Sequence, residues 1–383
     1  MSFGTLALIC LCALAGPLVS SAGGGTIPVV VGELLIGVLI GRTGFNAIDP
    51  SNTTLNFLYE IGFAMLMFVA GMSVPLREPG LAQSIGRGAR AAALVALLAV
   101  GAGLLLSQLA DAGHAAVYAV LVASGSAAIV LPILQERGLT DSVALTVMAQ
   151  VTVADVASMV AVPLALQPSH AAKVVLGSAI VVVCALGLLL LARQLRGNQR
   201  LHKLRMLGRR RRWAVDLRVA LVVLFGFAWL TERSGASLLI AGFGSGLMVA
   251  SIGGPKRLSN EVLGIGGGFF VPLFFVVLGA RLDLRGLFSD AELIAFAAVL
   301  VALNALTHVL GARLLRMPRD AGLVTSAQLG VPSAIVALGL PLHVLTPPQA
   351  AAIVVAALAS IAVCSLGAVG MARASDPRGL QQS

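Results

Sequence analysis

Long apolar runs, separated by short polar or basic connections, repeat along almost the whole chain. Thirteen of these runs approach the roughly 20 residues that an α-helix needs to span the hydrocarbon core of a bilayer. We expect them at residues 4–22, 27–41, 55–74, 91–109, 114–135, 143–166, 174–192, 214–231, 235–252, 262–280, 291–312, 321–341 and 349–372. The pattern therefore predicts an all-α polytopic membrane protein with about 13 transmembrane helices.

Composition agrees with this prediction. Of the 383 residues, 58% are hydrophobic and only 11% are charged, whereas soluble domains carry roughly 25% charged residues. All four cysteines lie inside apolar runs, which predicts neither a disulfide framework nor a metal cluster. We also expect no cofactor. The glycine clusters GFGSG (242–246) and GIGGG (264–268) have the spacing of close helix packing and lack the strand-turn-helix context of nucleotide binding.

The net charge of +10 is better explained by membrane topology than by nucleic-acid binding. Twenty of the 26 Lys and Arg residues lie in odd-numbered connections or at the C-terminus, and five lie in even-numbered connections. This asymmetry predicts an external N-terminus and a cytoplasmic C-terminus, as in a bacterial plasma membrane. Residues 193–213 supply nine of the basic side chains and are expected to form a cytoplasmic loop near anionic lipid. Residues 374–383 would form a short cytoplasmic tail.

Two distant segments resemble each other. SGSAAIVLPILQERGLT (124–140) and LGVPSAIVALGLPLHVLT (329–346) each place a Gly or Pro break before a Ser-Ala-Ile-Val-like run. They lie seven predicted spans apart, so they would run in opposite directions through the membrane. Inverted repeats with discontinuous helices in matching positions are typical of secondary transporters, whose binding site lies at the breaks.

Asp155 lies inside the predicted span that follows the first break, in QVTVADVASMVAVPLAL (150–166). A charged residue at mid-membrane costs at least roughly 3 kcal/mol, so such residues usually face a cavity and function there. A carboxylate in that place holds either a proton or a hard cation. We expect the cation ligands to be Asp155, Thr152 on the same helix face, Ser126, and carbonyl groups freed at the break. The alternative is a protonated acid that a neighbouring helix satisfies.

Other polar residues within the predicted spans are secondary candidates. His308, with Asn304 one turn before it, is either a packed hydrogen-bonding residue or a cation that pairs with Asp155 when the site is empty. Weaker candidates for the site lining are Gln150, Gln328 and Ser333.

Two further acids lie in predicted spans. Glu33 and Glu60 are in spans two and three, near glycine-rich packing segments. We expect them to be structural or to lie at a protomer interface.

Five motifs in order point to a known family. They are IPVVVGELLIGVLIGRTGF (27–45), LYEIGFAMLMFVAGMSV (58–74), SGSAAIVLPILQERGL (124–139), TERSGASLLIAGFGSGLMVAS (231–251) and FFVPLFFVVLGARLDL (269–284). With them the chain resembles the monovalent cation:proton antiporters over residues 5–373. The resemblance is to the second branch, which includes bacterial sodium/proton and potassium/proton exchangers. It implies that Na+ or K+ and H+ are the substrates, and that Asp155 matches the ion-carrying aspartate.

The same resemblance implies a domain organisation. Residues 1–373 would form the antiporter domain, with two crossed discontinuous helices, and the protein would be a homodimer. Its transport core would lie within residues 91–192 and 262–373, and its dimerisation helices within residues 4–74 and 214–252.

Two positions depart from the family pattern. Electrogenic relatives carry a second acid, and many sodium exchangers an Asn, directly before the key aspartate, whereas this chain has Ala154. Many sodium exchangers carry Lys or Arg where this chain has His308. With one carboxylate exchanging one proton for one monovalent cation, the cycle would be electroneutral.

Alternative functions remain compatible with the sequence. A sodium-coupled organic anion symporter would share the discontinuous helices, and a transport-impaired membrane sensor would explain the departures at Ala154 and His308. A passive potassium channel would need a repeated carbonyl filter, which the sequence lacks. The chain contains no discernible Ser-His-Asp or metal-ligand constellation, so we expect no enzyme.

Overall fold

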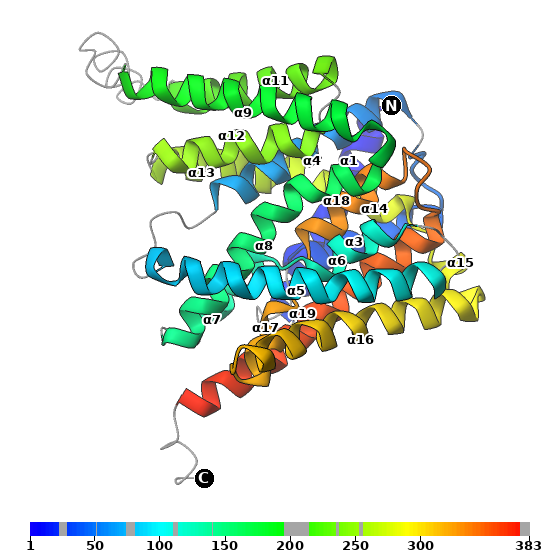
Figure 1. Ribbon diagram of the computed structural model, residues 1–383. Coiled ribbons are helices and arrows are strands. Elements are labelled where there is room, and N and C mark those ends of the chain that lie inside the picture. Colours follow the sequence, from blue (N-terminus) through cyan, green and yellow to red (C-terminus); the bar gives the residue numbers. More distant parts are fainter. Residues whose placement is uncertain are drawn as a thin grey trace. The chain divides into compact units, whose positions relative to one another are not determined.

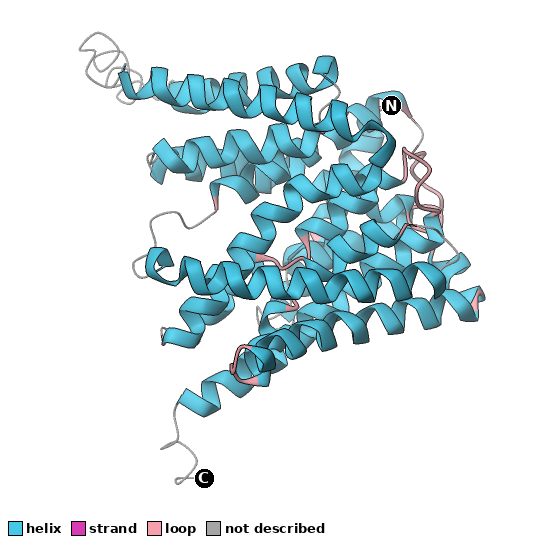
Figure 2. Cartoon of the chain, viewed as in Figure 1, coloured by secondary structure: helices cyan, strands magenta, loops and turns pink. Residues whose placement is uncertain are grey.

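The computed structural model describes residues 1–22, 29–50, 52–73, 81–109, 114–139, 141–194, 214–234, 237–252 and 256–375. Within these ranges every regular element is a helix (Figure 1, Figure 2). Eight helical segments of the described residues, some of which combine consecutive helices, are long and apolar enough to cross a membrane, and three shorter apolar segments accompany them. The predicted all-α membrane fold is therefore confirmed.

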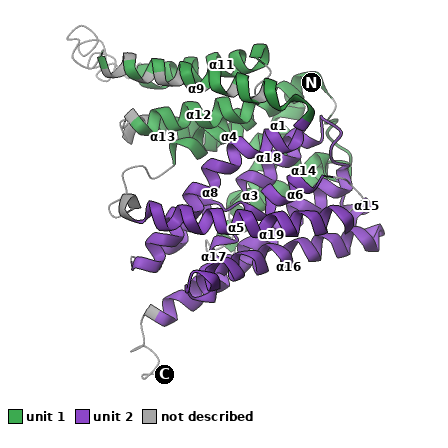
Figure 3. Ribbon diagram, viewed as in Figure 1, with its two compact units in different colours: residues 1–74, 169–282 green, residues 75–168, 283–383 purple. Residues whose placement is uncertain are grey.

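The helices form two compact units (Figure 3), Met1–Val74 with Ser169–Leu282, and Pro75–Pro168 with Asp283–Ser383. The first unit contains α1 (Phe3–Ala13), α2 (Ala15–Ala22), α3 (Val29–Ile40), α4 (Thr53–Met72), α9 (Ala171–Gln194), α11 (Val215–Ser234), α12 (Leu238–Ile252), α13 (Lys256–Ile265), a π-helix (Gly266–Phe270) and α14 (Val271–Arg281). The second contains α5 (Leu81–Leu109), α6 (Ala115–Ala123), α7 (Ala127–Glu136), α8 (Ser142–Leu166), α15 (Leu284–Ser289), α16 (Ala291–Leu314), α17 (Arg319–Thr325), α18 (Gly330–Gly339) and α19 (Pro347–Ser375).

Glycines bring helices of the first unit into backbone contact. A Cβ added to Gly246 of α12 would lie 2.1 Å from the Phe68 carbonyl oxygen of α4, and one added to Gly242 would lie 2.7 Å from that of Ala64. The cluster GFGSG therefore packs α12 against α4, as its spacing predicts. Gly37 of α3 approaches Val276 of α14 in the same way.

The second unit contains the two predicted discontinuous helices. α6 ends at Ala123 and α7 starts at Ala127, while α17 ends at Thr325 and α18 starts at Gly330. Pro332 lies in the first turn of α18, where its missing N–H costs no intrahelical hydrogen bond. The breaks are therefore confirmed at the positions that the Ser-Ala-Ile-Val-like repeats indicate.

The backbones of the two breaks touch. A Cβ added to Gly125 would lie 3.2 Å from the Thr325 carbonyl oxygen. A side chain at this position would push the two main chains apart by a few tenths of an ångström, and glycine avoids this. The contact joins segments that are 200 residues apart in the sequence.

Every one of the thirteen predicted segments contains helix. Residues 174–192 and 262–280 contain most of α9 and α14, which lie in the first compact unit. In that unit α14 packs closely on α3 and α4, and α9 packs on α11 and α12. Of the predicted basic loop, residues 195–213 lie outside the described residues, as do residues 376–383 of the tail.

Candidate functional site

Asp155 is held in the middle of a continuous helix. The carboxylate of Asp141 caps α8 by accepting a hydrogen bond from the Ala144 N–H at 2.7 Å, an arrangement typical of helix N-termini. From there α8 runs to Leu166, with Pro163 in its last turn. The cap fixes the start of the helix and thereby the place of Asp155 along it.

The Asp155 carboxylate lies against the first residue of α7. Its Oδ2 accepts a hydrogen bond from the Ala127 N–H at 3.3 Å. The first N–H groups of a helix have no partner within that helix and carry the positive end of its dipole. The break between α6 and α7 thus provides a backbone donor for an acid on a neighbouring helix.

Of the two predicted hydroxyl groups, that of Thr152 lies on α8 and that of Ser126 lies in the break before α7. The Thr152 hydroxyl, one turn before Asp155, donates to the Met148 carbonyl oxygen at 2.7 Å, which leaves its oxygen lone pairs to accept. Ser126 is buried and directly precedes Ala127. A carboxylate, hydroxyls and backbone carbonyls are the oxygen ligands that replace the hydration shell of an alkali cation.

Two other predicted polar residues of this unit, His308 and Asn304, bond to groups at the helix breaks. His308 of α16 contacts the Val122 carbonyl oxygen and the Thr325 hydroxyl, and Asn304 donates to the Ser326 carbonyl oxygen. Among the described residues, neither ring nitrogen of His308 bonds to Asp155.

Gln150, on α8 before Asp155, is buried, and its Oε1 has no hydrogen-bond partner among the described residues. A buried oxygen that stays unpaired costs free energy. Binding of water or of a transported cation by the Gln150 Oε1 would remove that cost. Ser333, by contrast, donates to the Leu329 carbonyl oxygen of its own helix at 2.7 Å.

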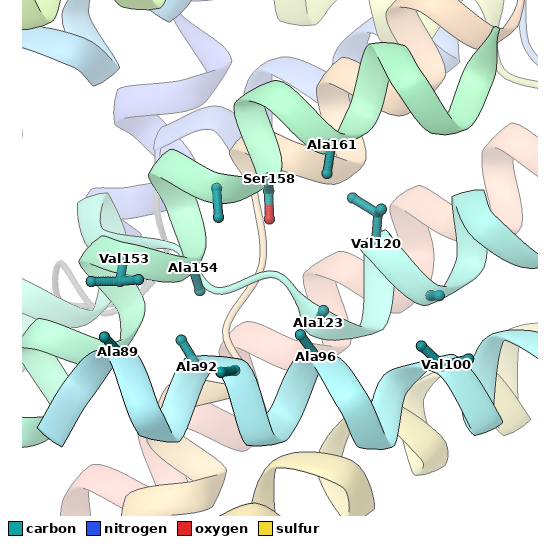
Figure 4. Close-up of a pocket in the computed structure, with 13 residues that line it drawn as sticks. Ala89, Ala92, Ala96, Val100, Val120, Ala123, Val153, Ala154, Ser158 and Ala161 are labelled. Carbon is teal, nitrogen blue, oxygen red and sulfur yellow. The ribbon is translucent and has the colours of Figure 1, made fainter. Parts of the chain in front are cut away.

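An apolar cavity lies between α5, α6 and α8 (Figure 4). Its volume is about 370 Å³, and its lining consists of alanine and valine side chains except for Ser158. Ala154 is part of that lining. The position directly before Asp155 therefore faces an apolar space and carries no group that could titrate or bind a cation.

Glu33 and Glu60 both belong to the first unit. Glu33 is buried in α3 beside Gly16 of α2, and its Oε2 has no hydrogen-bond partner among the described residues. Glu60 is exposed on α4. In the same unit the Arg281 guanidinium stacks over the Tyr59 ring, 4.0 Å from its centroid.

Several residues at the site were not identified from the sequence. The Ala127 N–H, the Val122 carbonyl and the Thr325 hydroxyl take part through backbone geometry or through distant contacts. The two similar Ser-Ala-Ile-Val-like segments indicated the helix breaks near which these groups lie. The alanines of α5 at positions 89, 92, 93 and 96 recur at helical spacing. This spacing indicates that they share one face of the helix, which is the face that lines the cavity.

Comparisons with known proteins agree on one family. The family model described as sodium/hydrogen exchanger, transmembrane, matches residues 6–372. YjbQ of Bacillus subtilis (strain 168), named as a Na(+)/H(+) antiporter, is 25% identical over 94% of this chain and 62% of its own length. The chain thus spans less than two thirds of that relative.

Other relatives match smaller shares of the chain. A Na(+)/H(+) antiporter of Enterococcus hirae is 26% identical over 80% of this chain and 79% of its own length. The glutathione-regulated potassium-efflux system protein KefC of Enterobacter sp. (strain 638) is 28% identical over 66% of this chain and 41% of its own length.

The fold also matches a solved structure. The sodium proton antiporter MjNhaP1 from Methanocaldococcus jannaschii superposes with a TM-score of 0.62 and 16% sequence identity, over 97% of this chain and 96% of that chain. At this identity the likeness concerns the fold, which is that of an integral membrane protein with discontinuous helices. The family match across nearly the whole chain shows that this chain belongs to the transmembrane sodium/hydrogen exchanger family.

Proposed function

We propose that this protein exchanges a monovalent cation, Na+ or K+, for protons across a membrane, and that Asp155 carries each of them in turn. The observation that carries the proposal is the hydrogen bond from the Ala127 N–H to Asp155. It sets the acid at the helix break where a transporter of this family would bind its ion. The names of the relatives include sodium/proton antiport and potassium efflux, so both cations are candidates.

The chemistry follows from a single carboxylate. A proton on Asp155 occupies the oxygen that a cation would need, so the two ligands exclude each other. Thr152 and Ser126 would supply further oxygens to the cation. Because the loaded carboxylate is neutral with either ligand, its passage through the hydrocarbon region avoids the cost of moving a bare charge.

An electroneutral cycle is the stoichiometry that this site favours. One proton moves in one direction and one monovalent cation in the other, so no net charge crosses. Ala154 supports this proposal, because it adds no second carboxylate and lines an apolar cavity.

The two units suggest a division of labour. We assign ion transport to the second unit, which holds Asp155 and both breaks, and a scaffold and homodimer role to the first. Alternating access would then move the site between the two sides of the membrane. The distribution of Lys and Arg supports a bacterial plasma membrane with the N-terminus outside, the C-terminus in the cytoplasm, and the basic segment near anionic lipid.

Reconstitution into liposomes with a trapped pH dye tests this function. Addition of Na+ or K+ outside should make the lumen alkaline at a rate that saturates with cation concentration. In the Na+ experiment, a potential of about 100 mV set by K+ and valinomycin should leave the final pH gradient unchanged. One net charge per cycle would instead shift that equilibrium by about 50-fold, because 100 mV is worth about 2.3 kcal/mol per charge. If neither cation moves protons, the exchange proposal fails.

A further inference from the structure

His308 bonds to both helix breaks at once. Its Nε2 lies 3.0 Å from the Val122 carbonyl oxygen, in the last turn of α6. Its Nδ1 lies 2.9 Å from the Thr325 hydroxyl, at the end of α17. A carbonyl only accepts, so Nε2 must be the donor. The Thr325 hydroxyl has one proton and two acceptors in reach, Nδ1 of His308 at 2.9 Å and the Gly322 carbonyl oxygen at 3.0 Å; when it donates to Nδ1, the ring is neutral. One uncharged imidazole therefore satisfies both contacts.

Gln328 and Asn304 make a second connection beside the first. Gln328, in the break between α17 and α18, donates from Nε2 to the Leu121 carbonyl oxygen of α6 and to the Asn304 Oδ1, the latter at 3.0 Å. Asn304 in turn donates to the Ser326 carbonyl oxygen at 2.8 Å. Both side chains are buried, 3% exposed for Asn304 and 4% for Gln328. They link the two breaks to α16.

Two of the acceptors in these contacts, the Val122 and Ser326 carbonyl oxygens, are groups that a broken helix leaves without a partner in that helix. The last carbonyls of a helix lack intrahelical donors, and a buried unpaired carbonyl inside a membrane protein costs free energy. Interrupting α6 and α17 frees such carbonyls at Val122 and Ser326, whereas the Leu121 carbonyl also accepts from the N–H and the hydroxyl of Ser124. Side chains from α16 and from the second break supply the missing donors, so neither break can be moved alone without losing hydrogen bonds.

We propose that His308, Asn304 and Gln328 are positioning residues that form a polar bridge between the two breaks and so hold the N-terminus of α7 against Asp155. The Ser124–Ser126 connection is the short link between the bridged end of α6 and Ala127, whose N–H reaches Asp155. The bridge thus acts on the ion through the acid and does not touch the ion itself. A test of the bridge by transport rests on the proposed cation/proton exchange, whereas a test by hydrogen exchange of the backbone amides does not.

Substitution of His308 separates this role from that of a proton carrier. Glutamine does not titrate, but its amide can donate to Val122 and accept from Thr325, as the neutral imidazole does. Leucine can do neither. If His308 positions the breaks, His308→Gln should keep the exchange activity that His308→Leu loses. If His308 carries a proton, both variants should lose exchange activity.

The experiment compares wild type, His308→Gln and His308→Leu in the liposome assay. We expect His308→Leu to lower the maximal exchange rate by at least about tenfold. His308→Gln should stay within about threefold of wild type, with an unchanged dependence of rate on pH. Loss of exchange in His308→Gln as severe as in His308→Leu would overturn the positioning role and leave the exchange function standing.

Hydrogen exchange measured by mass spectrometry tests the bridge without transport. In His308→Leu, amides of residues 123–128 and 326–330 should both exchange at least about tenfold faster than in wild type, because both breaks lose the shared contact. If His308→Leu does not fold, Thr325→Val takes its place. This substitution removes the hydroxyl that contacts His308 and the Gly322 carbonyl, and it should accelerate exchange in both segments. Acceleration at only one of the two segments, in whichever variant folds, would overturn the bridge.

Discussion

Asp155→Asn should abolish cation-driven proton movement, with a residual rate at least about 100-fold below wild type. Asparagine keeps the shape of the side chain and an oxygen that can accept from the Ala127 N–H, but it neither binds a proton nor neutralises a cation. The loss corresponds to about 2.7 kcal/mol, close to the roughly 3 kcal/mol that a bare charge costs at mid-membrane. The measurement is internal alkalinisation in liposomes after addition of Na+ or K+.

Glu292→Gln is the matched control for this substitution. Glu292 is an exposed acid at the start of α16, and its neutralisation also removes one negative charge from the second unit. Its exchange rate should match wild type. Exchange by Asp155→Asn at a rate similar to that of the control would remove Asp155 from the mechanism.

Ala127→Pro should weaken exchange by about 10- to 100-fold, mainly by raising the cation concentration needed for half-maximal rate. Proline is well tolerated at the first position of a helix, because the N–H at that position has no intrahelical partner. At Ala127, however, that N–H is the donor to Asp155. A hydrogen bond to a charged group contributes about 1.5–3 kcal/mol, which sets the expected range.

The control is Ala291→Pro. Ala291 is the first residue of α16, and the capping Asp290 accepts from Glu292 and Leu293 instead of from Ala291. Asp290 is also in an extended conformation, which a following proline requires. Both variants place proline at the start of a helix in the same unit. Equal exchange by Ala127→Pro and Ala291→Pro would show that the Ala127 hydrogen bond does not support ion binding.

The sequence was sufficient to predict the helix breaks and the acid beside them. Gly125 and the glycine and proline at the start of α18 interrupt two otherwise continuous apolar runs, and local chain chemistry decides such interruptions. Asp155 stood out because an acid is costly in an apolar span. These are local properties, and they can be recognised without knowledge of the fold.

The partners of these groups could not be predicted, because they depend on distant contacts. His308 and Val122 are separated by 186 residues, and Gln328 and Leu121 by 207. Spacing within one helix shows which side chains share a face, but it does not show which carbonyl lies opposite. The placement of α14 with α3 likewise depends on the approach of Gly37 to Val276, which two separate apolar runs do not reveal.

Proton release on cation binding tests the central claim most directly. Purified protein in weakly buffered detergent solution is mixed with Na+ or K+, and a pH dye and calorimetry record protons released and cations bound at each pH of a series. If Asp155 holds either ligand but not both, wild type releases up to one proton per cation bound, and Asp155→Asn releases none. Cation binding by wild type without proton release, or the same release from Asp155→Asn, would contradict the account.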